Sequence, residues 1–258
     1  MKKNITTNPN PTPPSTAQAI PPMPPENLKP FFSFYGGKWR IAPKYPAPQQ
    51  DTIIEPFAGS AGFSLRYPHK QVLLYDIDPK ICAVWDYLIT AKESEILALP
   101  LLQESDHIDD FDLPNEAKWL IGFNIGMGSS HPRKRPSPFA LVKKSWSEKK
   151  KNRIASQQKF IRHWKIKNQP YWEISDIEAH WFIDPPYNNK AGSCYRHSDI
   201  DYPHLSKWCQ NRSGVAVVCE NTGADWLPFE HFTDAKRTGN FYSKKGAYSK
   251  EAIWTQGI

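Results

Sequence analysis

The chain has few cysteines and no long apolar segment. Its 258 residues include Cys82, Cys194, Cys209 and Cys219, with no C-x-x-C pair. This spacing argues against a disulfide scaffold or a zinc module and favours a reduced, cytoplasmic protein. No apolar run approaches the roughly 20 residues that cross a bilayer, and the first residues lack the apolar core of a secretory signal. We therefore expect no membrane partner.

Two common site patterns are also missing. The phosphate-binding pattern G-x-x-x-x-G-K-[ST] does not occur. No group of His and Cys has the spacing of metal ligands, so we expect no metal.

Acidic residues are scarce in one segment. The chain carries a net charge of +7, but residues 131–167 hold thirteen Lys or Arg and one acid, Glu148, so this segment is +12 and the rest −5. Such a block suggests a polyanionic partner, most simply nucleic acid, although a solvated helix face or a disordered basic loop has the same composition. The candidate contacts are Arg133, Lys134, Arg135, Lys143, Lys144, Lys149, Lys150, Lys151 and Arg153.

Proline dominates the beginning of the chain. Residues 1–30 contain nine prolines and almost no periodic apolar pattern, which predicts a disordered or polyproline-like tail with order beginning near Phe31.

Strand and helix patterns alternate after this tail. A hairpin is expected around the Lys244-Lys245-Gly246 turn. The alternation predicts an α/β fold whose sheet is mostly parallel, with its ligands bound outside the carboxyl ends of the strands. Strands are expected over 52–57, 71–78, 180–184 and 214–221, and helices from about 63, over 79–91 and near 202–211.

The alternation stops between about 93 and 167. We interpret residues 93–167 as a basic insert and residues 31–92 with 168–258 as the main domain.

Three motifs lie at the beginning or end of predicted elements. "EPFAGSAGF" (55–63) leads from a strand into Gly59 and Gly62, which permit a tight turn against a ligand. Asp76 ends the next strand, where an acid can accept from ribose hydroxyls. "FSFYGGK" (32–38) is a glycine turn followed by Lys38. Each motif also has a plain structural explanation. Residues 55–63 could be an ordinary strand–helix turn, and residues 32–38 a turn with an exposed lysine. Asp76 could cap the next helix, although Asp78 is better placed to do so.

The least common string is Asp184-Pro185-Pro186-Tyr187, directly after an apolar strand. A carboxylate and backbone carbonyls at a strand end can accept both N–H groups of a planar amine, and the tyrosine offers a stacking face for a flat ring.

Taken together and in this order, the segments resemble the Dam-like, D12-class DNA adenine N6-methyltransferases, over residues 31–92 and 168–258. The resemblance implies a Rossmann-like, S-adenosylmethionine-dependent methyltransferase sheet with a small inserted target-recognition domain. It also implies double-stranded DNA as substrate, in the cytoplasm of a bacterial or phage-infected cell.

The resemblance further implies roles for individual residues. Asp184 and the Pro185 carbonyl, with Pro186 in the same bend, are expected to hold the amino group of an adenine flipped out of the duplex, and Tyr187 to stack on that base. Two positions depart from the family pattern: Ala61 takes a frequent glycine position, and Phe34 stands where several relatives have Trp. The expected cofactor residues are Phe34, Tyr35, Lys38, Glu55, Phe57, Gly59, Gly62, Asp76, Asp176 and Asp184.

The insert matches the family poorly, so its role is inferred from charge. We expect Arg133, Lys134 and Arg135 to read base edges, and Lys149 to Lys151 with Arg153 to contact phosphates.

Other functions share parts of this pattern. Cytosine N4 methylation uses the same amine chemistry but more usually has Ser at position 184, and RNA or protein amide methylation more typically has Asn there. A cytosine C5 enzyme would need a Pro-Cys nucleophile, which is absent. A non-catalytic nucleic-acid-binding protein with the same fold is the alternative from another class.

Overall fold

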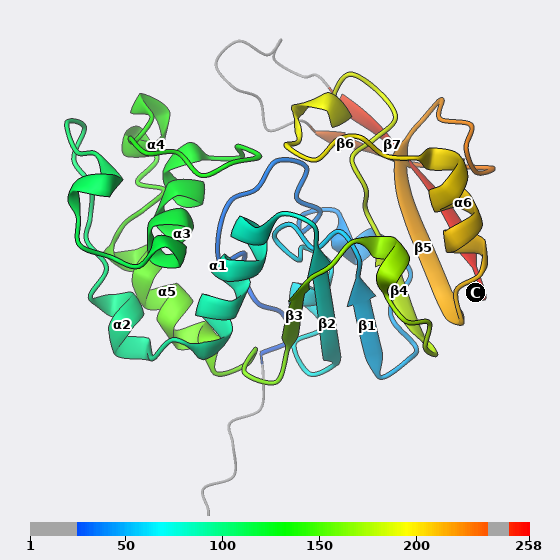
Figure 1. Cartoon of the computed structure of the whole chain (residues 1–258), viewed down its shortest axis with the longest axis horizontal. Coiled ribbons are helices and arrows are strands. Elements are labelled where there is room, and N and C mark those ends of the chain that lie inside the picture. Colours follow the sequence, from blue (N-terminus) through cyan, green and yellow to red (C-terminus); the bar gives the residue numbers. More distant parts are fainter. Residues whose placement is uncertain (1–24, 237–247) are drawn as a thin grey trace, which may run out of the picture.

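A seven-stranded sheet forms the centre of the molecule (Figure 1). The computed structural model describes residues 25–236 and 248–258. Strands β1 to β5 pair in parallel, whereas β7 is antiparallel to both β5 and β6. The sheet order is β3-β2-β1-β4-β5-β7-β6. The strands are β1 (Thr52–Glu55), β2 (Gln71–Asp76), β3 (Lys165–Asn168), β4 (Ala179–Ile183), β5 (Gly214–Asn221), β6 (Glu230–Lys236) and β7 (Tyr248–Gln256).

The central strands are buried on both faces. Successive side chains of a strand point to opposite faces. Ile53 and Phe182 accordingly belong to one core cluster, while Ile54 and Trp181 belong to the other. All five residues of β4 are buried, which explains why this strand is a continuous apolar run in the sequence.

The chain changes direction across the sheet between β1 and β4. From β1 it proceeds to β2 and β3 on one side, and from β4 to β5 on the other. Such a switch point leaves a crevice outside the carboxyl ends of the strands. The α/β, mostly parallel sheet predicted from the sequence is therefore confirmed, and it is consistent with a methyltransferase fold.

A helix packs against each face of the sheet. Helix α1 (Pro79–Thr90) packs Ile81, Val84 and Trp85 into the first cluster, and Asp78 caps it by accepting from the Lys80 N–H. Helix α6 (Tyr202–Gln210) covers the opposite face. The prediction of a helix from residue 63 is wrong, because only the short 3₁₀ turn η2 (Ser64–Arg66) forms there. The 3₁₀ turns are η1 (Ala42–Lys44), η2 (Ser64–Arg66), η3 (Ile108–Asp110), η4 (Tyr171–Glu173) and η5 (Gly192–Cys194).

The residues between α1 and β3 form a helical lobe at one side of the sheet (Figure 1). Its Phe123 and Ile154 belong to the same core cluster as Trp85. The predicted boundary at 167 is too late, because Lys165 and Lys167 lie in β3 of the sheet. The helices of the lobe are α2 (Glu93–Leu97), α3 (Asn115–Gly126), α4 (Pro138–Val142) and α5 (Glu148–Gln158).

Order begins earlier than Phe31. Leu28 is fully buried, its N–H donates to Leu65 O, and its carbonyl accepts from the Trp39 indole. The rest of the predicted tail, residues 1–24, lies outside the described residues, and so does the Lys244-Lys245-Gly246 turn. Strands β6 and β7 do pair in antiparallel fashion, as a hairpin requires.

Within the described ranges, no helix has the length and apolar character needed to cross a membrane.

We predict that Leu28→Ala lowers the free energy of unfolding by about 2–5 kcal/mol, because it leaves a cavity in the core. The matched control is Leu101→Ala, since Leu101 is 39% exposed and should cost less than about 0.5 kcal/mol. Chemical denaturation measures both. Equal, small effects would mean that residues 25–30 belong to the tail.

Candidate active site

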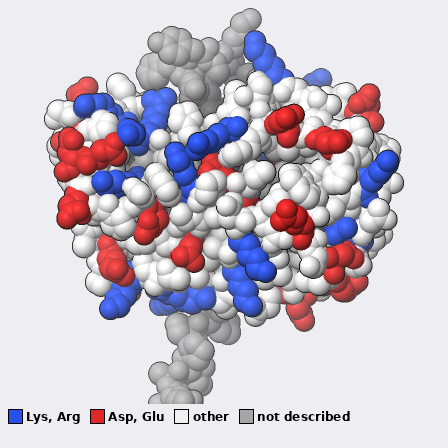
Figure 2. Space-filling view, in the orientation of Figure 1, with Lys and Arg blue, Asp and Glu red and all other residues white. Residues whose placement is uncertain are grey.

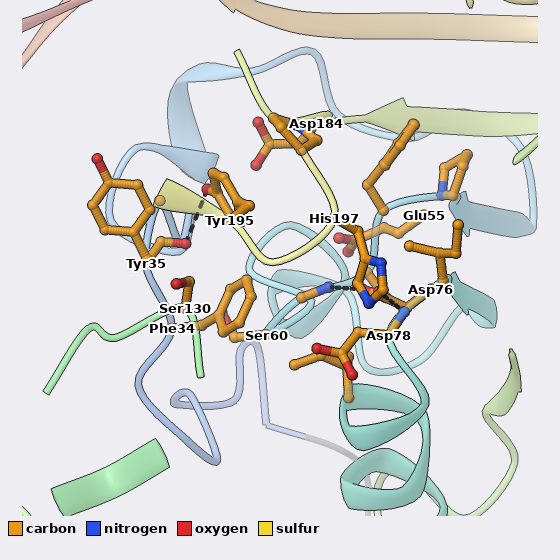
Figure 3. Close-up of a pocket in the computed structure, with 18 of the residues that line it drawn as sticks. Phe34, Tyr35, Glu55, Ser60, Asp76, Asp78, Ser130, Asp184, Tyr195 and His197 are labelled. Atoms are coloured by element: carbon orange, nitrogen blue, oxygen red, sulfur yellow. Dashed lines mark hydrogen bonds between the residues drawn. The ribbon is translucent and has the colours of Figure 1, made fainter. Parts of the chain in front are cut away.

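A cavity opens outside the carboxyl ends of β1, β2 and β4, at the switch point of the sheet (Figure 3). Asp184 lies on one side of it, and Asp76 with Asp78 on the other. Of the predicted site residues, ten line this cavity: Phe34, Tyr35, Lys38, Glu55, Phe57, Gly59, Gly62, Asp76, Asp184 and Pro186. Residues from four separate segments of the sequence thus meet in one place.

Asp76 joins the glycine turn to the start of α1. Its carboxylate accepts from the N–H of Gly59 at 3.0 Å and from the N–H of Asp78 at 2.9 Å. Burial raises the pKa of Asp76 from its ordinary value to about 6, although these backbone donors oppose the shift. Each oxygen keeps a further lone pair, so the group can still accept from a ligand hydroxyl.

The glycine turn is shaped by close contacts with the Lys38 segment. A Cβ on Gly62 would lie 2.6 Å from Trp39 N and 2.9 Å from Lys38 N. Gly59 has φ +45°, and a Cβ there would meet the Phe34 ring at 2.9 Å. Gly62, which lines the cavity, therefore also lets the backbone that carries Lys38 pack closely against the turn.

Ala61 occupies the position where the family often has glycine. Its φ is +49°, in the left-handed region that costs a residue with a Cβ about 1–2 kcal/mol. The turn keeps this conformation because Ala61 is fully buried and its N–H donates to Ala58 O.

Glu55 supports the turn from below. It is buried and accepts from the Ser64 N–H at 2.8 Å, at the beginning of η2. Burial raises the pKa of Glu55 to about 8, although the contacts with Ser64 lower it. Glu55 is thus protonated at neutral pH and adds no charge to the cavity.

Lys38 and Asp184 form an ion pair at the edge of the cavity. The Lys38 ammonium lies 2.8 Å from Oδ2 and 2.7 Å from Oδ1, and it also donates to Gly36 O at 3.0 Å. Only Oδ2 receives a well-aligned hydrogen bond, and Oδ1 has no aligned donor among the described residues. Burial raises the pKa of Asp184 to about 6, with Lys38 limiting the shift. Burial lowers the pKa of Lys38, but the nearby acids, Asp184 first, outweigh it and raise that pKa.

The DPPY bend is held by residues that the motif search missed. Tyr202 donates to Pro186 O, Glu220 accepts from the Asn188 N–H, and Glu251 accepts from the Tyr187 hydroxyl. The Tyr187 ring lies beside Lys38, 4.9 Å from the ammonium, whereas Pro185 and Tyr187 do not line the cavity itself. Glu220 and Glu251 come from strands β5 and β7. The sequence feature that could have pointed to Glu220 is an acid inside an apolar strand, as in "GVAVVCEN".

The loop after the bend also lines the cavity, and sequence reasoning did not assign it. Tyr195, His197 and Asp199 face the cavity, and the Tyr195 hydroxyl donates to Tyr35 O (Figure 3). Ser130 of the lobe lines the cavity too and donates to Cys194 O. This loop thereby links the Lys38 segment to the helical lobe.

Asp176 is not at this site, so its predicted contact with a cofactor is wrong. It precedes β4 and therefore lies at the opposite edge of the sheet, where it accepts from Ser213 N and pairs with Arg212. The positions beside Asp76 at the cavity are instead taken by Pro170, Tyr171 and Trp172.

Three of the predicted DNA contacts are structural. Lys151 is buried and donates to Leu97 O and Leu99 O, while Lys150 and Arg153 both donate to Pro30 O. Burial, with Arg153 nearby, lowers the pKa of Lys150 well below its usual range. All three side chains are hydrogen-bonded at the junction of the lobe, and Lys151 is too deeply buried to contact a phosphate as we expected.

The remaining basic candidates are exposed. One of them, Lys134, pairs with Asp109 at 2.6 Å, and residues 93–116 of the same lobe hold eight acids. Figure 2 accordingly shows basic and acidic side chains interspersed on this side of the molecule. The segment before Arg133, "FNIGMGSSHP", begins inside helix α3, which its first four residues end. The exposed candidates are Arg133, Lys134, Arg135, Lys143, Lys144 and Lys149.

Residues 34–112 match the family model of the D12 class N6 adenine-specific DNA methyltransferase. This match confirms the resemblance to the D12 class. The matched residues include Lys38, the glycine turn, Asp76 and α1, whereas Asp184 lies beyond them. The comparison with curated proteins found no match.

The D12-class match implies S-adenosylmethionine-dependent methylation of adenine in DNA. The residues that line the cavity suit a nucleoside ligand of that kind: a carboxylate with free lone pairs, close-packed glycines and exposed apolar side chains such as Ile77 and Trp172. Among the described residues, no group of three His, Cys, Asp or Glu could hold a metal ion.

We predict that Gly62→Ala lowers the free energy of unfolding by about 1–3 kcal/mol and weakens cofactor binding, because its Cβ pushes the Lys38 backbone away. Ala61→Gly at the next position should instead raise stability by about 0.5–1 kcal/mol, since it relieves the left-handed strain. Thermal unfolding and calorimetric titration measure both. Equal effects of the two variants would contradict this account of the turn.

We predict that Lys151→Met destabilises the fold by about 1–3 kcal/mol, because two backbone carbonyls lose their donor and Glu148 loses its cationic partner. The exposed neighbour Lys149→Met should leave stability within about 0.5 kcal/mol. If Lys149 contacts phosphate, that variant also reduces the salt slope of DNA binding by about 1. Denaturation curves and binding at several salt concentrations distinguish the two lysines.

Proposed function

We propose that the chain is a site-specific methyltransferase that acts on N6 of adenine in double-stranded DNA. The observation that carries this proposal is the position of Asp184: a half-buried carboxylate, paired with Lys38, whose Oδ1 receives no aligned hydrogen bond from the described residues, at the edge of the same cavity as Asp76. One end of the cavity thus offers acceptors for a ribose, and the other end offers an acceptor for an amine.

On the cofactor side, Asp76 would hold the ribose hydroxyls, and the turn at Gly59 would lie under the methionine portion. Phe34, Tyr35 and Phe57 would supply apolar walls, with Ile77 and Trp172 beside the cofactor's base. S-adenosylmethionine, when bound, supplies an activated methyl group at this site.

On the substrate side, Asp184 Oδ1 and the Pro185 carbonyl would accept the two N–H groups of the target amine. Both acceptors direct the lone pair of the nitrogen away from the base ring and toward the cavity. Positioning and preorganised acceptors then lower the barrier, with no covalent intermediate on the protein. Lys38 keeps its hydrogen bond to Oδ2 and so holds Asp184 in its ionised form.

The target base must leave the duplex to reach this site, at a cost of a few kcal/mol. Stacking on Tyr187, worth roughly 1–3 kcal/mol, offsets part of that cost. The exposed basic residues of the lobe support a role as the DNA-recognition region. In this role, Arg133 and Arg135 would reach base edges, and Lys143, Lys144 and Lys149 would contact phosphates.

We predict that the protein transfers label from S-adenosylmethionine to unmethylated DNA, and that the label appears in N6-methyladenine after digestion to nucleosides. Asp184→Asn should lower transfer about 100-fold or more, because one acceptor of the amine is lost. Cofactor binding by Asp184→Asn, measured separately, should remain within a few fold. Label in N4-methylcytosine would change the target base, and cofactor binding without any transfer would favour a non-catalytic DNA-binding protein.

We predict that kcat at saturating cofactor falls about tenfold per pH unit below about pH 6, where Asp184 takes up a proton. Because the folded pKa lies above the ordinary value, this protonation favours the folded state, so unfolding of this origin does not cause the loss. Stopped assays from pH 5 to 8 give the profile. The residual activity of Asp184→Asn should lack this acid limb, and an identical limb in that variant would assign it to another group.

A further inference from the structure

Glu251 is a buried acid on the antiparallel strand β7. It is 6% exposed and lies opposite Asn221 of β5 in the sheet register. A carboxylate in such surroundings needs a partner, because burying an unpaired charge is costly. Its partner is the Tyr187 hydroxyl, which donates to Glu251 Oε2 across 64 positions of sequence.

Contacts on several sides hold Tyr187. The hydroxyl is fixed by Glu251, and the ring lies beside the Lys38 ammonium. Its backbone is closely packed as well, since a Cβ on Gly192 would lie 1.9 Å from Tyr187 O. The Asn188 N–H, one residue further on, donates to Glu220 at 3.0 Å. A phenol ring has two torsions, and a bond to its hydroxyl removes the freedom that the backbone contacts leave.

We propose that Glu251 is a positioning residue: it holds the Tyr187 hydroxyl and thereby fixes the ring face on which the target base stacks. This inference rests on the proposed function. Burial raises the pKa of Tyr187 well above its usual range, with Asp184 and Glu251 adding to the shift, so the hydroxyl keeps its proton and donates. A hydrogen bond to a charged acceptor is among the stronger ones, which suits a group that must stay in place while a base enters.

Glu251 also lies close enough to Lys38 and Asp184 to affect their charge states. A role through Tyr187 therefore has to be separated from an electrostatic role on the ion pair. Tyr187→Phe makes that separation, because it removes the hydrogen bond and keeps both the ring and the charge of Glu251.

A double-mutant cycle tests the inference, with Glu251→Ala, Tyr187→Phe and the double variant assayed for kcat and cofactor affinity. Each single variant should lower kcat about tenfold while the cofactor Kd stays within about twofold. The double variant should be no slower than either single variant, because both remove the same bond. Glu251→Gln, which keeps an acceptor oxygen, should recover most of the rate. The exposed acid Glu230 in β6 provides the control Glu230→Ala, which should match the wild type.

Full activity in Glu251→Ala overturns the inference, and so do rate losses that multiply in the double variant. If Glu251→Ala does not fold, Tyr187→Phe decides, because it removes the same hydrogen bond: a kcat within about twofold of the wild type overturns the inference. A wild type without methyl transfer contradicts the proposed function instead. In that event the same double-mutant cycle is measured by thermal unfolding, which needs no substrate. A coupling free energy near zero between Glu251 and Tyr187 overturns the inference that Glu251 holds the Tyr187 hydroxyl, and a measurable coupling supports it.

Discussion

The ion pair between Lys38 and Asp184 joins the segment before β1 to the end of the central strand β4. The two residues are 146 positions apart, and their contact lies where the sheet changes direction. Other features of the site serve this contact. Gly62 lets the Lys38 backbone approach the turn, and the buried strand β4 carries Asp184 to the edge of the cavity. The pair also keeps a carboxylate ionised where burial alone would favour its neutral form.

Acids in this site differ in charge because their surroundings differ. Glu55 is deeply buried and binds a backbone N–H, so it holds its proton at neutral pH. Asp184 has a cationic partner and stays ionised above about pH 6. Of Glu55, Asp76 and Asp184, the two aspartates thus remain charged, one at the end of the cavity where an amine would enter and one where hydroxyls would bind.

The helical lobe changes the meaning of the basic segment. Its positive charge is concentrated in sequence, but the fold pairs Lys134 with Asp109 and buries Lys151 in the junction. Burial of an ammonium is tolerated there because backbone carbonyls at the end of α2 need donors. A charge count along the chain therefore overstates the surface available to DNA.

Local pattern alone determined much of this protein. Apolar runs and proline at the first helical position predicted β4, β5 and α1, because burial on both faces and a fixed φ leave clear traces in sequence. The motifs at Lys38, Asp76 and Asp184 predicted one site, because parallel strands bring their carboxyl ends to one edge. The place of Asp176 also follows from the sequence, since a residue that precedes the apolar run of β4 lies at the opposite edge of the sheet. Tertiary structure alone decided the rest. Glu251 reaches Tyr187 only because β7 runs antiparallel beside β5, a long-range pairing that local sequence does not encode.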